Sequence, residues 1–221
     1  MIRLCDVRSG AILATGEDAV RRSAAWLDEG GMLAHPTETV YGLGGRPDAD
    51  IDAEIARLKG RDPGQPLIRI ASDFDELRRA VPMAEWTGGA ERLAERFWPG
   101  PLTLVLAWRG AESGGGVAVR VDAHPVLRRV LQESGGVMTS TSLNLAGEAP
   151  AGTVGQAREI LDRLPDARRP LSILEAGDVG PSLPSTILSL VGERPRLIRE
   201  GAIGRSELDE VLTTPVQGSH P

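Results

Sequence analysis

Two cations at close spacing are the first residues whose chemistry points to a ligand. Lys59 and Arg61 flank a glycine at the end of a predicted helix, just before a loop bounded by Pro63 and Pro66. Arginine supplies a planar fork of donors and lysine a compact charge, so the pair suits a polyphosphate. The alternative interpretation is that both cations stabilise the negative end of the helix dipole.

A second candidate site lies at the end of a predicted strand at residues 137–141. The segment VMTSTSLNLAG places four hydroxyl residues in a row, including Ser140 and Ser142, and then Asn144. Clustered hydroxyl groups, together with backbone amides at a turn, cradle phosphate without charge. The pattern therefore predicts another wall of an anion site.

The segment HPTETVYGLGG at residues 35–45 leaves an apolar strand and presents Thr37, Glu38 and Thr39 at a predicted sheet end. Loops at strand ends are common ligand sites in open α/β sheets. A tight turn alone explains the glycines, because glycine adopts backbone angles closed to other residues, but it does not explain the polar cluster. We therefore expect these residues to face a ligand.

Arg120 is the one charged residue in the apolar run VAVRV. Alternation along a strand points it away from the face of Val119 and Val121. A cation in that position needs an anionic partner or a polar cavity. A buried ion pair with a protein carboxylate is the alternative to a ligand contact.

Other polar groups near predicted strand ends are Thr103, Thr186 and Arg199. Phe97 and Trp98 come just before Thr103, and we assign them to packing, because large aromatic side chains more often fill cores than bind ligands.

Length and charge limit the class of protein. The chain has 221 residues, with 31 acidic and 25 basic side chains and a net charge of −6. At roughly 150 residues per domain, we expect one domain over residues 1–212, followed by a flexible tail over residues 213–221. Negative charge disfavours a broad nucleic-acid surface but permits a local basic pocket.

The cellular setting and the common cofactor classes follow from short patterns. A lone cysteine, Cys5, fits a reducing compartment, and the longest apolar run is about a third of the ~20 residues that span a bilayer, so we expect a cytoplasmic protein with no membrane segment. His35, His124 and His220 lack metal-ligand spacing, so no metal bound by protein side chains is expected. Pro47 breaks the only approach to a GxGxxG fingerprint, which disfavours Rossmann-type binding.

Hydrophobic periodicity predicts the elements that must position these residues. Helices are predicted at residues 18–29, 50–59, 73–80, 89–97, 125–133, 154–164 and 205–212. Strands are predicted at residues 32–35, 67–71, 102–108, 117–121, 137–141, 171–174, 186–191 and 196–199. Early strands alternate with helices whereas later ones follow one another directly, so we expect an α/β fold: a twisted mixed β-sheet with packed helices.

Seven segments, in order, resemble the YrdC-like family, whose members include threonylcarbamoyl-AMP synthases. They are HPTETVYGLGG, LKGRDPGQPL, FWPGPLTLVL, VAVRV, TSTSLNLAGE, PST and LIREGAI, and the match runs from about residue 16 to residue 203. The chain's only lysine, tyrosine and asparagine, Lys59, Tyr41 and Asn144, all fall inside these segments. That coincidence favours a functional role over chance retention. The chain resembles the short, single-domain form of the family.

The resemblance implies a large concave cavity that binds ATP, L-threonine and bicarbonate or carbon dioxide. The residues that resemble ATP contacts are Lys59, Arg61, Gln65, Thr103, Ser140, Ser142, Asn144 and Arg199. The residues that resemble threonine contacts are Thr37, Thr39, Arg120 and Thr186, and Thr103 suits either substrate.

The reaction implied by the resemblance starts with capture of carbon dioxide by the threonine amine. The carbamate then attacks the α-phosphate of ATP, and the threonylcarbamoyl-AMP formed passes to a tRNA threonylcarbamoyl transferase that modifies adenosine 37. No catalytic nucleophile or base is assigned, because positioning and charge stabilisation by Lys59 and Arg61 suffice. We expect Mg²⁺ held by the ATP phosphates and no tightly bound organic cofactor.

Three positions depart from the family pattern. Asp62 stands where a proline usually follows the KxR motif, Leu143 replaces the alanine of the SAN triplet, and Gln65 stands where asparagine is frequent. These differences bear on the local shape of the ATP loop.

Two other functions remain open at this point. One is a paralogous enzyme that carbamoylates a different acceptor. The other is an RNA-binding module without catalysis, which net negative charge and scarce aromatic residues disfavour.

Overall fold

The computed structural model describes residues 1–62, 67–109, 115–180 and 183–218. The predicted ATP contact Gln65 lies outside these described residues. Within them the chain forms one sheet of 11 strands. The strands are β1 (Arg3–Asp6), β2 (Ile12–Thr15), β3 (Met32–Pro36), β4 (Tyr41–Gly45), β5 (Ile68–Ala71), β6 (Leu102–Ala107), β7 (Gly116–Val121), β8 (Val137–Ser142), β9 (Leu171–Glu175), β10 (Thr186–Ser189) and β11 (Arg196–Arg199).

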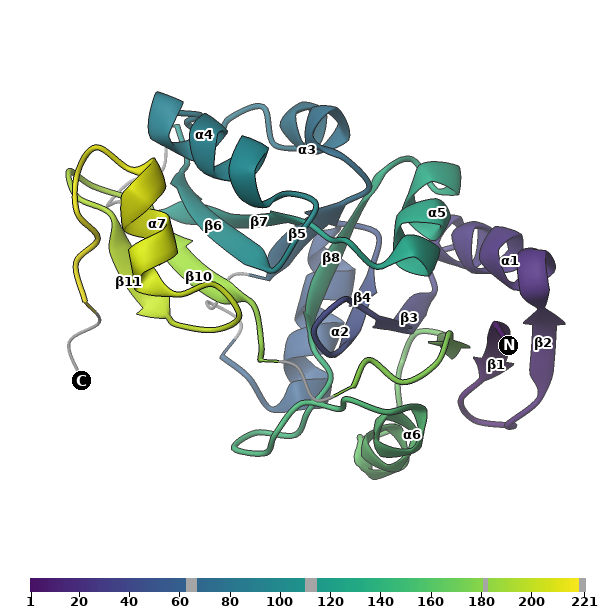
Figure 1. Cartoon of the computed structure of the whole chain (residues 1–221). Coiled ribbons are helices and arrows are strands. Elements are labelled where there is room, and N and C mark those ends of the chain that lie inside the picture. Colours follow the sequence, from purple (N-terminus) through teal and green to yellow (C-terminus); the bar gives the residue numbers. More distant parts are fainter. Residues whose placement is uncertain (63–66, 110–114, 181–182, 219–221) are drawn as a thin grey trace.

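The sheet is mixed, as predicted. Its strand order is β11-β10-β6-β7-β5-β8-β4-β3-β9-β1-β2. The pairs β10–β6, β5–β7 and β3–β9 are parallel, and the other neighbouring pairs are antiparallel. Strands far apart in sequence are therefore brought side by side, and the sheet twists along its length (Figure 1).

Helices pack on the sheet in three groups (Figure 1). They are α1 (Gly16–Asp28), α2 (Ala49–Lys59), α3 (Phe74–Ala80), α4 (Gly88–Phe97), α5 (Pro125–Glu133), α6 (Val154–Arg163) and α7 (Arg205–Val211). Helices α1 and α5 share one buried cluster, α2 and α6 a second, and α3, α4 and α7 a third.

Strand β3 shows how alternation separates two of these clusters. Leu33 points into the cluster under α1 and α5, whereas Met32 and Ala34 point into the cluster under α2 and α6. Both faces of this part of the sheet are therefore covered. Every residue of β3 is buried, in keeping with a strand that has helices on both sides.

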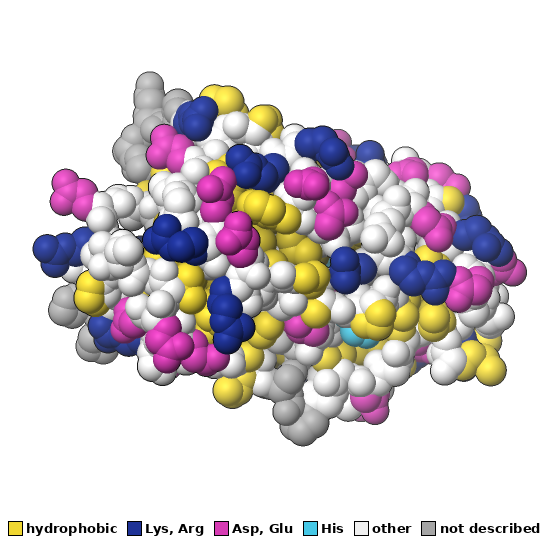
Figure 2. Space-filling model, turned by 45° about the horizontal axis from the view of Figure 1, so that its top comes forward, with side chains coloured by type: hydrophobic (Ala, Val, Ile, Leu, Met, Phe, Trp, Pro, Cys, Tyr) yellow, Lys and Arg dark blue, Asp and Glu magenta, His cyan; other side chains and the backbone are white. Residues whose placement is uncertain are grey.

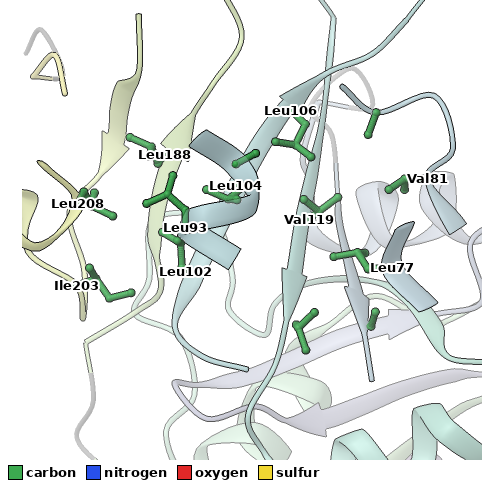
Figure 3. Close-up of a cluster of buried hydrophobic side chains, with 14 of the residues drawn as sticks. Leu77, Val81, Leu93, Leu102, Leu104, Leu106, Val119, Leu188, Ile203 and Leu208 are labelled. Atoms are coloured by element: carbon green, nitrogen blue, oxygen red, sulfur yellow. The ribbon is translucent and has the colours of Figure 1, made fainter. Parts of the chain in front are cut away.

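Strand β6 is apolar on one face only. Leu102, Leu104 and Leu106 pack against α4 and α7 in the third cluster, together with Leu93 and Leu208 (Figure 3). The intervening Thr103 and Val105 point to the opposite face. No helix among the described residues covers that second face, which forms the wall of the candidate site.

All the predicted helices and predicted strands are confirmed, with ends that agree within two residues. Strand β4 is different, because no strand is predicted at residues 41–45, where the glycines are typical of a tight turn. The structure instead pairs Tyr41–Gly45 with both β3 and β8. Its glycines are needed for close approach: a Cβ on Gly44 would lie 2.1 Å from the carbonyl oxygen of Thr139.

Strands β1 and β2 also escaped prediction. Each has four residues, and they pair with each other, while β1 pairs in addition with β9. Ile12 and Leu13 of β2 are exposed, since β2 is at the edge of the sheet. Such short strands lack the alternating pattern from which strands are predicted.

Residues 216 and 217 are packed against the domain, although a flexible tail is predicted for residues 213–221. Val216 is buried in the cluster with α7, and its amide donates to the carboxylate of Asp209. Gln217 forms a bridge with Arg196 on β11. Burial of one valine side chain and these backbone bonds explain why the segment is packed.

Candidate active site

The face of β6 and β7 that carries Thr103 and Arg120 bounds a cavity of ≈ 360 Å³. Residues from most of the central strands contribute to its wall. Eight of the predicted site residues line it: Thr37, Thr39, Arg61, Thr103, Arg120, Ser140, Ser142 and Arg199. The structure thus brings together segments that are far apart in the sequence, as the motifs predict.

Its basic lining contrasts with the rest of the surface. In the view of Figure 2, basic and acidic side chains are interspersed, with hydrophobic side chains exposed between them. This face of the molecule has no broad basic area, in keeping with the net charge of −6. An anionic ligand is therefore attracted by the cavity rather than by the surface around it.

The end of helix α2 positions Lys59. Asp48 caps the start of this helix, and Gly60 ends it in the left-handed conformation, with φ at 59°. The Nζ of Lys59 donates to the carbonyl oxygen of Ser142 at 2.5 Å and to Oδ1 of Asn144 at 2.8 Å. Burial, with a smaller effect of the Arg61 charge, lowers the pKa of Lys59 to about 8.

Arg61 reaches the same strand end from the other side of Gly60. Its guanidinium donates to Oγ1 of Thr141 at 3.3 Å, an atom that Lys59 also approaches, at 3.4 Å. Burial lowers the pKa of Arg61, and the nearby Asp62 charge opposes that effect. Two desolvated cations side by side favour a ligand with several negative charges.

Asn144 is not among the residues that line the cavity, but it binds Lys59. Its Oδ1 accepts from Lys59 and, at 2.7 Å, from Oγ of Ser142. Its Nδ2 donates to the carbonyl oxygens of Leu145 and Glu148. Both ends of the amide are thus bonded to protein, so Asn144 holds Lys59 and the turn after β8 in place.

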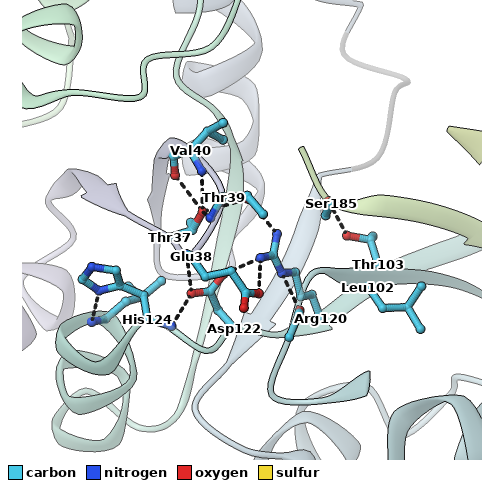
Figure 4. A network of polar contacts seen from close by, with 12 residues as sticks. Thr37, Glu38, Thr39, Val40, Leu102, Thr103, Arg120, Asp122, His124 and Ser185 are labelled. Carbon is cyan, nitrogen blue, oxygen red and sulfur yellow. Dashed lines mark hydrogen bonds and ion pairs between the residues drawn. The ribbon is translucent and has the colours of Figure 1, made fainter. Parts of the chain in front are cut away.

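Arg120 has both of the environments that its sequence context suggested. It lines the cavity, yet its guanidinium forms ion pairs with Glu38 at 2.5 Å and Asp122 at 2.9 Å (Figure 4). Its Nε donates to the carbonyl oxygen of Gly100 at 3.1 Å, and one Nη lies 3.4 Å from Oγ1 of Thr39. The buried ion pair predicted as the alternative is therefore present, and Arg120 lines the cavity as well.

The two carboxylates beside Arg120 differ in environment. Asp122 is fully buried, and its Oδ1 accepts backbone amides of Glu38 and His124. Burial raises the pKa of Glu38 above its usual range, although Arg120 lowers it. The guanidinium is thus held by Glu38, a member of the predicted polar cluster at residues 37–39, and by Asp122, which sequence analysis does not assign to the site.

The turn between β3 and β4 is built on Thr37. Its hydroxyl donates to the carbonyl oxygen of Val40 at 2.6 Å and accepts the amides of Thr39 and Val40 (Figure 4). This short-range bonding closes the turn tightly. It places Thr39 beside Arg120 at one end of the cavity.

Arg199 and Thr103 are joined by Ser185, a hydroxyl residue of the PST segment that sequence analysis does not assign to either substrate. The guanidinium of Arg199 donates to the carbonyl oxygen of Ser185 at 2.8 and 3.1 Å, and Oγ of Ser185 lies 3.1 Å from Oγ1 of Thr103. Burial, followed by the charge of Arg120, lowers the pKa of Arg199. A third cation therefore faces the cavity near Arg120.

Thr186 is a correction to the predicted site. It is fully buried, and its hydroxyl donates to the carbonyl oxygen of Ile203 at 2.7 Å while accepting the amides of Gly201 and Ile203. Alternation along β10 places Ser185 and Ile187 on the cavity face instead. Thr186 therefore stabilises the loop after β11 rather than lining the cavity.

Other residues singled out in the motifs lie in the core. Tyr41 packs under α2, and its hydroxyl donates to the carbonyl oxygen of Gly177. Trp98 packs against the third cluster, as expected. Leu143 is buried with Tyr41, so its departure from the family pattern points away from the cavity. Asp62 acts on Arg61 through its charge.

His35 was interpreted only as a histidine at a strand end. The structure buries it completely and places its Nε2 3.0 Å from Oγ of the cavity residue Ser140. The signal in the sequence was a lone polar residue at the end of an apolar strand, directly before the Thr37–Thr39 cluster. That signal does not identify Ser140, which is 105 positions away in the sequence, as the partner of His35.

Taken together, these residues define a class of α/β protein in which a hydroxyl-lined and cation-lined hollow on one sheet face receives an anionic ligand. The Sua5/YciO/YrdC family model, described as telomere recombination, matches residues 25–201. The chain belongs to this family.

Relatives with assigned names are similar over most of the chain. Threonylcarbamoyl-AMP synthases of Bacillus subtilis and Pyrococcus abyssi are 32% and 33% identical over 90% and 87% of this chain. The chain spans only 58% and 57% of the lengths of those relatives. A Halorhodospira halophila threonylcarbamoyl-AMP synthase is 39% identical, with 84% of this chain and 91% of the relative covered.

Solved structures share the fold. P. abyssi Sua5 complexed with L-threonine superposes with a TM-score of 0.78 at 30% identity, covering 92% of this chain and 60% of that one. E. coli YciO superposes with a TM-score of 0.75 at 25% identity, covering 88% of this chain and 95% of that one.

Proposed function

We propose that this protein is a threonylcarbamoyl-AMP synthase, which joins L-threonine, bicarbonate or carbon dioxide, and ATP. The observation that carries the proposal is the convergence of Arg61, Arg120 and Arg199 on one cavity of ≈ 360 Å³ in an acidic chain. That volume is typical of small-molecule sites. The names of the relatives favour this substrate set over other anions.

In the proposed complex the triphosphate lies at the end of the cavity near Lys59 and Arg61. Their paired charges attract phosphate oxygens, and bound phosphate offsets both the burial and the smaller repulsion by Arg61 that lower the pKa of Lys59. Ser142 on the cavity wall adds a neutral polar contact. Because these groups are held before the ligand arrives, they stabilise charge that builds up on the phosphate.

The threonine carboxylate is placed near Arg120 and Arg199, at the opposite end. Arg120 keeps its two protein carboxylates, so the cavity-facing part of the guanidinium, with Arg199, receives the ligand. Thr39 and Thr103 supply hydroxyl groups at this end. The amine then lies between the two ends, toward the triphosphate.

The proposed reaction needs no covalent enzyme intermediate. The threonine nitrogen bonds to the carbon of carbon dioxide and releases a proton, which gives a carbamate. A carbamate oxygen then bonds to the α-phosphorus as the bond to the pyrophosphate oxygen breaks. Alignment of the two substrates supplies a large part of the rate, because a bimolecular step becomes effectively unimolecular.

Magnesium is proposed to arrive with the triphosphate. Among the described residues there is no group of three His, Cys, Asp or Glu side chains arranged to hold a metal. Glu38 and Asp122, the carboxylates beside the cavity residue Arg120, form ion pairs with its guanidinium. The donor set therefore fits an ion held by substrate oxygens and water, whose role is to neutralise phosphate charge.

We further propose that the product passes to a tRNA threonylcarbamoyl transferase in the cytoplasm. The one cysteine, Cys5, is a buried free thiol, which suits a reducing compartment. No helix in the described part of the chain has the length and apolar character needed to cross a membrane.

Pyrophosphate release tests the proposal. The wild-type chain should release pyrophosphate only when ATP, threonine and bicarbonate are all present, and threonylcarbamoyl-AMP should appear by mass spectrometry. Arg61→Ala should lose most of this activity, whereas Arg21→Ala, which changes an exposed arginine on α1, should retain it. Pyrophosphate release that ignores threonine but responds to another amine would replace this function by that of a paralogue.

A further inference from the structure

A buried histidine and a cavity serine form a pair that the proposed reaction has not yet used. His35 on β3 and Ser140 on β8 meet across β4, where residue 42 is a glycine. A Cβ on Gly42 would lie 2.7 Å from Cε1 of His35 and 2.9 Å from Oγ of Ser140. Glycine at this position is therefore a condition for the contact.

The direction of the hydrogen bond follows from the other ring nitrogen. Nδ1 of His35 lies 3.3 Å from the carbonyl oxygen of Pro36, which can only accept, so Nδ1 carries the proton. Complete burial lowers the pKa of His35 to about 4, which keeps the ring neutral at ordinary pH. Nε2 is therefore an acceptor, and the hydroxyl of Ser140 donates to it at 3.0 Å.

Ser140 consequently presents only lone pairs to the cavity. A hydroxyl has one donor hydrogen, and the ring of His35 takes it. Phosphate oxygens are acceptors, so Ser140 does not donate to a phosphate oxygen while His35 holds its hydrogen. The group opposite it in the complex must itself carry an N–H or O–H.

The position of Ser140 narrows the choice of that group. Ser140 is opposite Ile68 of β5 on strand β8, and Arg120 is opposite Ile70, two residues further along β5, on strand β7. In the other direction, the carbonyl oxygen of Ser142 holds Lys59. Ser140 therefore lies between the Arg120 end and the Lys59 end of the cavity wall.

We propose that Oγ of Ser140 accepts a hydrogen bond from the N–H of the amino-acid substrate, and that His35 is the positioning residue that fixes this acceptor. The assignment rests on the proposed function, in which the amine lies between a carboxylate at Arg120 and a triphosphate at Lys59. The ammonium form and the carbamate form of the substrate both keep an N–H. One acceptor thus serves the substrate before and after it captures carbon dioxide.

Separate binding measurements on the full chain test the acceptor role. Ser140→Ala should weaken threonine binding about tenfold, the loss expected for a hydrogen bond from a charged donor, and should leave ATP binding within about twofold. With 2-aminobutyrate, which lacks the hydroxyl of threonine, the same loss should remain. Loss of the effect with 2-aminobutyrate would assign the bond to the substrate hydroxyl and overturn the proposal, as would equal or greater weakening of ATP binding.

The positioning role of His35 has a spectroscopic test that does not depend on any variant folding. Nitrogen-15 spectra of the wild-type protein should show a neutral histidine protonated at Nδ1, and the opposite tautomer would overturn the proposal. His35→Gln keeps an acceptor for Ser140 and should restore the threonine KM that His35→Leu raises, with kcat less affected. If the wild-type chain makes no threonylcarbamoyl-AMP, the proposed function fails, while the tautomer result stands by itself.

Discussion

Nζ of Lys59 lies 2.8 Å from Oδ1 of Asn144, although the two residues are 85 positions apart in the sequence. The amide that receives the lysine is itself fixed, because its Nδ2 donates to two carbonyl oxygens of the following turn. The strand end after β8 and the helix end after α2 are joined through this contact. Asn144 therefore influences the proposed triphosphate site through Lys59.

The Lys59–Asn144 contact predicts strongly non-additive mutations. Asn144→Ala should weaken ATP binding by a factor close to that of Lys59→Ala, because the lysine loses its fixed position. The double variant should be little weaker than either single one, since residues that act as a unit share one loss. Calorimetric titration with a non-hydrolysable ATP analogue would measure the cycle, and full additivity would contradict the role given to Asn144.

The affinity for ATP should fall as pH rises through about 8. Burial and the charge of Arg61 lower the pKa of Lys59 to about 8 in the free protein, and bound phosphate favours the charged lysine. Binding near pH 8 should therefore take up a proton, which calorimetry in buffers of different ionisation enthalpy detects. In Lys59→Arg the cation stays charged, so affinity should lose this dependence. If the wild type takes up no proton on binding ATP, the phosphates do not bind beside Lys59.

Periodicity predicted the helices and the long strands because these elements repeat apolar residues at fixed spacing. Of the residues that motif chemistry grouped, eight line the cavity, among them Thr37 and Arg199. Thr186 was misassigned because a hydroxyl beside a cavity residue can belong to either face of a strand. Its direction depends on register with β6 and β11, which the motif alone does not contain.

What sequence reasoning missed are contacts between groups with several possible partners. Arg120 needed an anion, but nothing local selects Glu38 and Asp122 over a ligand. His35 needs a polar partner. Ser140 becomes that partner only in the folded sheet, where β4 alone lies between β3, which carries His35, and β8, which carries Ser140. Strand β4 itself was hidden, because glycine is rare in strands and is required here by close backbone packing.

Removing Arg120 should destabilise the fold as well as impair binding. Asp122 is fully buried, and it would be left without its cation. Arg120→Met should lower the free energy of unfolding by about 3–5 kcal/mol, measured by urea denaturation. Adding Asp122→Asn should recover part of that loss, because the unpaired charge is removed. A variant as stable as the wild type would show that water reaches the site and that the pair is not structural.

Strand β4 should tolerate no side chain at Gly44. A Cβ added at residue 44 would lie 2.1 Å from the carbonyl oxygen of Thr139. Gly44→Ala should therefore lower the free energy of unfolding by about 2–3 kcal/mol. Gly155→Ala, in helix α6, is the matched control, because only a hydroxyl at 3.9 Å approaches its Cβ. That variant should be as stable as the wild type or gain about 0.5 kcal/mol. Equal stability of the two variants would contradict the β4–β8 register.

Leu143 tests whether a departure from the family pattern affects the site or the core. Its side chain is buried beside Tyr41 on the face away from the cavity. Leu143→Ala, which restores the family alanine, should lower the free energy of unfolding by about 2–4 kcal/mol, because it leaves a void in a packed cluster. ATP binding should be unchanged. Leu183→Ala is the control, since Leu183 is 64% exposed and its loss should cost less than about 0.5 kcal/mol. If Leu143→Ala instead changes ATP affinity with no loss of stability, the leucine shapes the nucleotide loop rather than the core.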